Sequence, residues 1–294
     1  MSLDPLLIAG ALVLGAILGS FLNALTFRYN TGLPLWRAMG GRSHCMRCNH
    51  ELGAFDLVPV LSWVFLCGHC RYCRSPISPQ YPLVEIAAAL LSVGVAFYVY
   101  NTACYTLYNT PCCTFMYLFW MMVWMTILFL VVYDWRHMIL PLEALALLTL
   151  LGFASLFFSY DAAYSVVLPD LWQLLAGPIL ALPLSLLSLI SSGRWMGWGD
   201  GILALPLGWI LGVSAGLSAL MLSFWIGAAV GLVLVAVARL REPRGDSFKF
   251  GLKESPRGSR HLTLKSALPF GPFLALGAAI VFFTHLDLFT IIRW

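Results

Sequence analysis

The sequence predicts an all-α polytopic membrane protein with about eight transmembrane helices. Hydrophobic residues make up 61% of the 294 residues and charged residues only 10%, which excludes an ordinary soluble domain. The apolar runs are also continuous, without the alternating polar residues of a transmembrane β-strand. Helices are therefore the structure that can satisfy the backbone hydrogen bonds of these runs inside a bilayer.

The long apolar runs give the positions of the predicted spans. A bilayer core about 30 Å thick needs about 20 helical residues, so the run at 201–213 is too short to cross it unaided and must be tilted, extended or partly buried in protein. The first run has only Asp4 as a charged residue before it and lacks the basic start of a signal peptide, so we expect it to be retained. The spans are predicted at residues 5–27, 81–100, 114–134, 141–159, 171–190, 201–213, 216–238 and 269–290.

Positive charges predict the orientation and the domain organisation. Arginine and lysine gather in residues 28–80 and 239–268, and loops rich in these residues stay in the cytoplasm. We therefore expect a first transmembrane helix at 1–27, a cytoplasmic loop domain at 28–80 and a multi-helix core at 81–294. The basic loop 239–268 belongs to that core and is expected to lie near anionic lipids rather than to bind nucleic acid.

Two aspartates emerge on the predicted cytoplasmic face. Asp134 ends the third span, and Asp200 lies in the sequence GWGD, where Gly197 and Gly199 permit a close approach of another backbone. Paired carboxylates can share a proton, so that one acts as a base toward water while the other polarises a carbonyl group. This chemistry hydrolyses peptide bonds without a metal. The alternative is that each aspartate is a helix cap or an interfacial residue.

Two CxxC pairs lie in the predicted loop domain. Cys45 and Cys48 form one pair, and Cys70 and Cys73 form the other. Each pair can present two thiolates from one turn, and two turns complete a tetrahedral zinc site. In a reducing cytoplasm these thiols should not form disulfides, and a loop too small for its own core would be folded by the metal.

Other cysteines leave alternatives open. Cys67 also makes a CxxC with Cys70 and is either a bystander or a substitute ligand. The pairs could be redox-active instead, although thioredoxin-like chemistry expects a βαβ setting. Cys104, Cys112 and Cys113 lie in the opposite loop, where a disulfide and free thiols are equally compatible with the sequence.

Seven motifs together resemble one protein family, the prepilin peptidases of type IV pilus and type II secretion systems. They occur in the family's order over nearly the whole chain, whereas GxGD alone is common to the wider group of intramembrane aspartyl proteases. The motifs are GSFLNALTFR (19–28), the twin CxxC loop, VPVLSW (58–63), CRYCRSPISPQYPLVE (70–85), DWRHMILP (134–141), GWGD (197–200) and LPFGPFLALG (268–277).

The resemblance implies a bifunctional enzyme of the bacterial inner membrane. It would remove the basic leader of a prepilin or pseudopilin at the cytoplasmic face, with Asp134 and Asp200 as the catalytic pair. It would then methylate the new N-terminus with S-adenosylmethionine, and Glu85 matches a family glutamate linked with methyl transfer. Glu85 could instead be an acid that simply starts a helix. Ile202 stands where the family has a lysine. This position therefore lacks the cation that the family has for positioning substrate or lipid.

Two other classes of function remain as alternatives. One is a proton-coupled transporter whose intramembrane acids carry protons, but the sequence has no evident inverted repeat to support it. The other is a noncatalytic zinc-bearing scaffold of a secretion machine. The partners expected from the sequence are the pilin-like substrate and the lipid bilayer, and the oligomeric state is not predicted.

Overall fold

The structure is a computed structural model that describes six segments of the chain. These are residues 4–29, 40–102, 111–158, 168–194, 196–241 and 269–291. Most of the predicted basic loop, from residue 242 to residue 268, lies outside them, as does Cys104.

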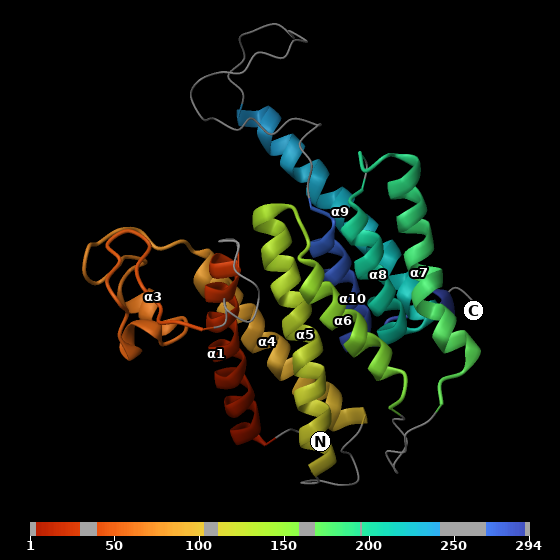
Figure 1. The fold of residues 1–294 in the computed structure, drawn as a ribbon, viewed down its shortest axis with the longest axis horizontal. Coiled ribbons are helices and arrows are strands. Elements are labelled where there is room, and N and C mark those ends of the chain that lie inside the picture. The colour runs from red at the N-terminus through yellow and green to blue at the C-terminus, as the bar shows by residue number, and fades with distance from the viewer. Residues whose placement is uncertain are drawn as a thin grey trace, which may run out of the picture.

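The described residues form helices and contain no strand, so the all-α fold class is confirmed (Figure 1). Each of the eight predicted spans corresponds to a helix, and consecutive helices of the bundle, long and short together, alternate in direction (Figure 1). The helices are α1 (Pro5–Tyr29), α3 (Leu61–Phe65), α4 (Gln80–Thr102), α5 (Pro111–His137), α6 (Leu142–Ser155), α7 (Leu171–Ile190), α8 (Trp198–Leu211), α9 (Val213–Arg241), α10 (Gly271–Thr284) and α11 (Leu288–Ile291), with a 3-10 helix η1 at Ala54–Leu57.

Five of these helices, α1, α4, α5, α7 and α9, are long and apolar enough to cross a membrane. The helices α6, α8 and α10 have 14 residues each, whereas the sequence indicated a short span only at α8. The α10 helix ends early because His285 adopts a left-handed φ of 53°. Beyond it, Asp287 accepts hydrogen bonds from the hydroxyl groups of Ser214 and Ser218 on α9.

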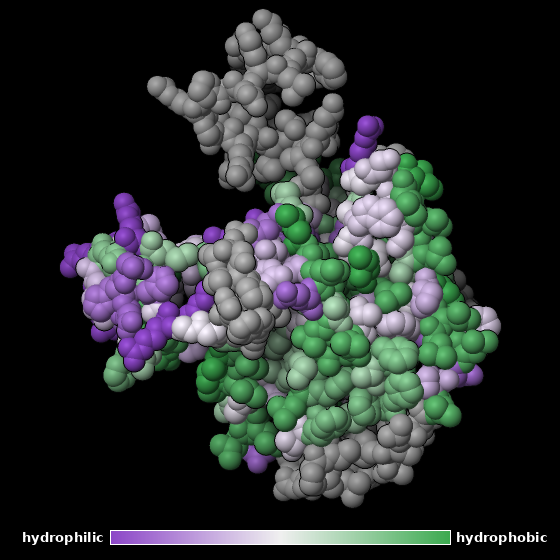
Figure 2. Space-filling view, in the orientation of Figure 1, coloured by the Kyte–Doolittle hydropathy of each residue, from purple (hydrophilic) through white to green (hydrophobic). Residues whose placement is uncertain are grey.

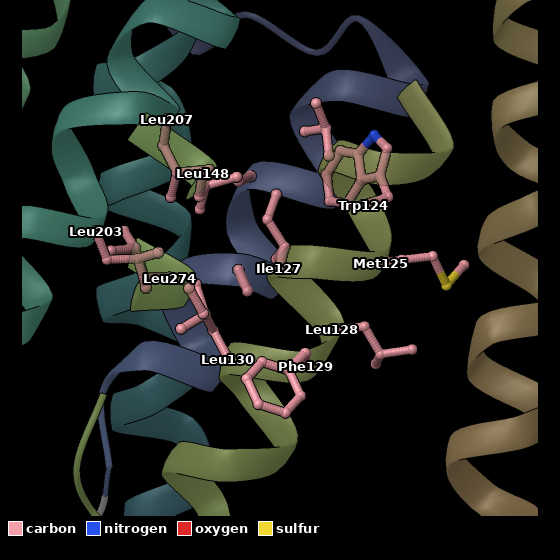
Figure 3. Close-up of a cluster of buried hydrophobic side chains, with 14 of the residues drawn as sticks. Trp124, Met125, Ile127, Leu128, Phe129, Leu130, Leu148, Leu203, Leu207 and Leu274 are labelled. Atoms are coloured by element: carbon pink, nitrogen blue, oxygen red, sulfur yellow. The ribbon is translucent and has the colours of Figure 1, made fainter. Parts of the chain in front are cut away.

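The core of the bundle lies around α5, which packs against α1, α4, α6 and α10. Figure 3 shows Trp124, Ile127 and Leu130 of α5 in the same buried cluster as leucines from three short helices. These leucines are Leu148 of α6, Leu203 and Leu207 of α8, and Leu274 of α10. This packing fixes the ends of α5, α8 and α10 relative to one another.

Two glycines let α1 pack directly on α4. A Cβ atom at Gly15 would lie 2.6 Å from the carbonyl oxygen of Ala88, and one at Gly19 would lie 2.9 Å from Cα of Glu85. Small residues spaced by four allow such close helix contacts in membranes. The α1–α4 pair therefore forms a rigid support next to the loop domain.

Residues 40–79, which we call the cysteine lobe, extend from the end of the bundle where α1 finishes and α4 begins (Figure 1). Figure 2 shows the lobe as mostly hydrophilic beside a largely hydrophobic bundle. The lobe lies within the domain predicted at 28–80, and residues 30–39 of that domain are outside the described segments. The domain boundaries at 27/28 and 80/81 remain a prediction.

Candidate active site and metal centre

The two aspartates meet at one end of the bundle. Asp134 lies in the last turn of α5 and Asp200 in the first turn of α8, and both side chains are buried. The position that a Cβ atom of Gly271 would occupy is 2.6 Å from Oδ2 of Asp134 and 3.7 Å from Oδ1 of Asp200. The carboxylates therefore border the same small space, and they interact electrostatically.

The starts of two helices orient these carboxylates. The backbone N–H of Gly271, the first residue of α10, donates a hydrogen bond to Asp134. The backbone N–H of Gly197, the N-cap of α8, donates to Asp200. Each acid is thus held by a backbone group that the helix itself leaves without an internal partner.

Gly271 is a site residue that the sequence reasoning did not identify. It belongs to the motif at 268–277, but no spacing rule connects residue 271 with residue 134. A side chain at this position would overlap the carboxylate of Asp134. The available signal was a glycine directly before a proline at a helix start, which is compatible with many other roles.

The two glycines of GWGD differ in their surroundings. Gly199 packs against Leu140, which would lie 2.8 Å from a Cβ atom there. Leu140 reaches this position because Met138 adopts a left-handed φ of 54° and ends α5. Gly197 has no such neighbour, since the nearest atom to its Cβ position is the Asp200 carboxylate at 3.7 Å. The Cβ position of Gly197 is therefore not crowded, while Gly199 serves the contact between the two aspartate motifs; the approach of a peptide at Gly197 remains a prediction.

Glu85 belongs to a second polar cluster, formed by α1, α4 and the cysteine lobe. Its buried carboxylate accepts a hydrogen bond from the backbone N–H of Val60 at 2.7 Å and another from the Ser20 hydroxyl. Nearby, the buried Asn23 donates to the carbonyl oxygen of Tyr81 at 3.2 Å. The Oδ1 atom of Asn23 has no hydrogen-bond partner among the described residues, which leaves an acceptor for a polar ligand.

The four predicted cysteines lie together in the lobe. The Sγ atoms of Cys45, Cys48, Cys70 and Cys73 all lie within 4.8 Å of one another. The Sγ atoms of Cys45 and Cys73 are 3.8 Å apart, and a tetrahedral site with Zn–S bonds of about 2.3 Å places its sulfurs at about that separation. The donor set and its spacing therefore fit a structural zinc ion. That the ion is zinc remains a prediction.

The two CxxC turns have the same backbone design. In the first, Asn49 follows the pair with a left-handed φ of 56° and donates its N–H to the carbonyl oxygen of Cys45. In the second, Arg74 has a φ of 53° and donates to Cys70. Each turn thus aims two thiols at a common centre. Cys67 is exposed and is not part of this cluster.

Local hydrogen bonds favour the thiolate form at two of the four clustered cysteines. Backbone hydrogen bonds from Cys48 and Arg47 lower the pKa of the Cys45 thiol to about 6. A hydrogen bond with the Ser75 hydroxyl lowers the pKa of Cys73. A backbone hydrogen bond with His50 lowers the pKa of Cys48, but burial and its hydrogen bonds with Cys45 and Cys73 outweigh it and raise that pKa to about 11. Thiolates are the form that binds a metal, so the lobe favours this form at Cys45 and Cys73, whereas Cys48 must lose its proton when a metal binds.

Cys113, near the start of α5, forms a disulfide. Its partner is not among the described side chains. The start of α5 is the end opposite to the acid pair, because Asp134 lies in the last turn of the same helix. The chain therefore carries free thiols in the cysteine lobe and an oxidised cysteine at the far side of the bundle.

Comparison with known proteins identifies the family. The profile of the Bacterial Peptidase A24 N-terminal domain matches residues 13–99, and that of the Type IV leader peptidase family matches residues 119–232. A Prepilin leader peptidase/N-methyltransferase of Aeromonas hydrophila is 31% identical over 251 residues, which is 84% of this chain and 73% of the relative. Proteins of the same name from Burkholderia pseudomallei (strain K96243) and Stutzerimonas stutzeri are 29% and 27% identical, over 94% and 90% of this chain and 85% and 86% of theirs.

No solved structure gives a significant match to the chain. The two family profiles cover both the region of the cysteine lobe and the region of the two aspartates. The matches to the relatives from Aeromonas hydrophila and Burkholderia pseudomallei extend that likeness over 84% and 94% of the chain. The protein therefore belongs to the type IV leader peptidase family.

Proposed function

We propose that this membrane protein is an aspartyl endopeptidase that removes the basic leader from prepilins or pseudopilins, with Asp134 and Asp200 as its catalytic pair. The observation that supports these residues most directly is that both buried carboxylates border the space beside Gly271. One carboxylate takes a proton from a water molecule, whose oxygen attacks the amide carbon. The other donates its proton to the carbonyl oxygen, and the leaving amine then receives a proton from the pair.

The peptidase is favoured over the transporter and the noncatalytic scaffold because the chain belongs to a peptidase family. The names of the relatives also include N-methyltransferase. We therefore propose that the same chain methylates the new N-terminal amine with S-adenosylmethionine, which supplies an electrophilic methyl group. Glu85 would hold the amine through its carboxylate and take up the proton that the ammonium must lose before its nitrogen attacks the methyl group, and S-adenosylhomocysteine would leave as the S–CH3 bond breaks. Asn23 would offer a second acceptor for the amine through Oδ1.

The cysteine lobe would hold one zinc ion through Cys45, Cys48, Cys70 and Cys73. The role of the metal would be structural, because four thiolates leave no open coordination position for catalysis. The ion would fix the lobe against α4, where Val60 meets Glu85.

We further propose that the acid pair and the cysteine lobe face the cytoplasm of a bacterial inner membrane. Arginines at 28, 42, 47, 71 and 74 lie at this end, as the positive-inside rule expects for a cytoplasmic face. The free thiols of the lobe and the disulfide of Cys113 at the other end agree with a reducing cytoplasm and an oxidising exterior.

A single assay tests the proposed reaction and the proposed aspartates. The purified chain is incubated with a synthetic peptide that carries a basic leader before an apolar segment, and the products are identified by mass spectrometry. We expect the wild type to release the leader and Asp134→Asn and Asp200→Asn to lose on the order of 10³-fold in rate. The matched control is Asp170→Asn, at the exposed N-cap of α7, where asparagine caps equally well. Cleavage at the normal rate by either active-site variant would contradict the residue assignment, and an inactive wild type would contradict the function.

The methyl transfer is tested in the same assay with S-adenosylmethionine added. We expect the cleaved wild-type product to gain the mass of one methyl group. Glu85→Gln should keep leader removal and lose this gain, because the amide cannot hold an ammonium ion by charge. If Glu85→Gln still methylates at the wild-type rate, the role of Glu85 is wrong, while the peptidase proposal is unaffected.

A further inference from the structure

One face of the short helix α3 exposes large apolar side chains. Leu61, Val64 and Phe65 are 54%, 55% and 81% exposed, and their spacing of three and four places them on the same face. Phe55, on the adjoining helix η1, is 82% exposed. On the rest of α3, Trp63 is partly buried and donates its indole N–H to the carbonyl oxygen of Ile77. A contiguous apolar patch of this kind marks a binding surface rather than ordinary solvent-exposed protein.

The position of α3 along the bundle is fixed by a direct bond to a transmembrane helix. Val60, the N-cap of α3, donates its backbone N–H to Glu85 of α4 at 2.7 Å. Glu85 lies about 8 Å along the helix axis from Gln80, the first residue of α4, at about 1.5 Å per residue. The start of α3 is therefore held near the second turn of α4, and Figure 1 shows α3 beside the upper part of α1 rather than beyond its end.

At that level the bundle already presents a lipid-facing surface. Leu83, Ile86 and Leu90 of α4 are 64%, 43% and 63% exposed, and they follow one another on one side of a helix long enough to span the membrane. The stripe begins two residues before Glu85. The start of α3 thus lies at the level where the exposed apolar stripe of α4 begins.

We propose that the apolar face of α3, together with Phe55, is inserted into the membrane interface. The leaflet concerned is the one on the side of the membrane where the cysteine lobe lies. A short amphipathic segment with aromatic residues is suited to the boundary between headgroups and acyl chains. The lobe also exposes Arg47 and Arg74, which favour anionic phospholipids. Figure 2 shows hydrophobic residues at the lower edge of the lobe, with others at its upper part, among mostly hydrophilic residues.

The test is photo-crosslinking of the full-length chain in lipid nanodiscs. The photoreactive residue p-benzoylphenylalanine is placed at Phe65 in nanodiscs of phosphatidylethanolamine and phosphatidylglycerol. The matched control position is Glu51, which belongs to the same lobe and forms an ion pair with Arg42 in which the side chains are 60% and 83% exposed. An interfacial face is buried about 5–10 Å into the headgroup boundary, so we expect about tenfold more phospholipid adduct at residue 65 than at residue 51.

Three results would overturn the proposal: equal lipid labelling at both positions, a dominant adduct between two copies of the chain, or a dominant adduct with a leader-bearing peptide added to the sample. The same label at Val64 provides a second position if the chain labelled at Phe65 does not accumulate. The readout is the mass of the adduct, so it does not depend on peptidase or methyl-transfer activity.

Discussion

Between residues 40 and 79 the chain buries only Gly68, Cys70 and Ser75, whereas the membrane helices bury large side chains such as Trp120 and Trp124. The bundle therefore has a continuous apolar core (Figure 3). The cysteine lobe has four thiols at its centre and several of its largest apolar side chains on its surface. The two regions belong to one chain but depend on different sources of stability.

This difference predicts how the proposed activities respond to damage. The acid pair depends on the packing of α5, α8 and α10, so it should tolerate changes in the lobe. Glu85 is bonded to Val60 of the lobe, so the proposed methyl transfer should depend on both regions. Four variants test this division, and we expect their effects to decrease from Cys45→Ser through Gly271→Ala and Gly19→Ala to Arg71→Ala.

Breaking the thiol cluster should have the largest effect. Cys45→Ser removes one of four ligands, and structural zinc sites contribute about 10 kcal/mol or more to folding in small domains. We expect the lobe to lose its metal and become sensitive to protease, while leader removal continues. Metal analysis and limited proteolysis measure this, with Cys67→Ser as the control because Cys67 is outside the cluster. A lobe that stays protected without metal would refute the metal-dependent fold.

A methyl group beside the acid pair should have the next largest effect. Gly271→Ala places Cβ 2.6 Å from the Asp134 carboxylate, so the acid must move. A displacement of about 1 Å in a catalytic group can cost about 100-fold in rate. We expect kcat for leader removal to fall by about that factor with little change in KM. The control is Gly231→Ala, whose Cβ meets no atom within 4 Å, and equal rates for the two variants would count against the geometry.

Widening the α1–α4 contact should cost a moderate amount of stability. In Gly19→Ala the new Cβ lies 2.8 Å from that of Ala88 and 2.9 Å from Cα of Glu85. Overpacking of this kind typically costs about 1–3 kcal/mol. We expect a lower thermal midpoint for the purified protein. Gly10→Ala on the same helix meets open space, and its midpoint should not fall.

The ion pairs of the lobe should contribute least. Arg42 and Glu51 are both exposed, and such pairs are worth about 1 kcal/mol or less. Arg71 lies 2.8 Å from Asp56, whose side chain is only 6% exposed. Loss of the Arg71 side chain therefore leaves the charge of a buried carboxylate that water solvates poorly. We expect Arg71→Ala to weaken the lobe against chemical denaturation more than Arg42→Ala. If Arg42→Ala destabilised the lobe more than Arg71→Ala, burial would not determine how much each ion pair contributes to stability.

The sequence predicted those features that depend on local pattern. Long apolar runs located all eight helices of the bundle, and the spacing of the CxxC pairs predicted which four thiols come together. The contact between Gly271 and Asp134 could not be predicted, because it depends on how α5 and α10 pack through residues such as Leu274. The early ends of α6 and α10 were also missed, since hydropathy extends across the backbone turn at His285.

The three short helices α6, α8 and α10 all begin at the end of the bundle that holds the acids. Each is about 21 Å long at about 1.5 Å per residue, less than the hydrocarbon thickness of about 30 Å. Membranes adapt to short segments by becoming locally thinner. Such local thinning would bring bulk water closer to Asp134 and Asp200, and the positively charged leader of the proposed substrate would stay among the lipid phosphates while the bond behind it is cut.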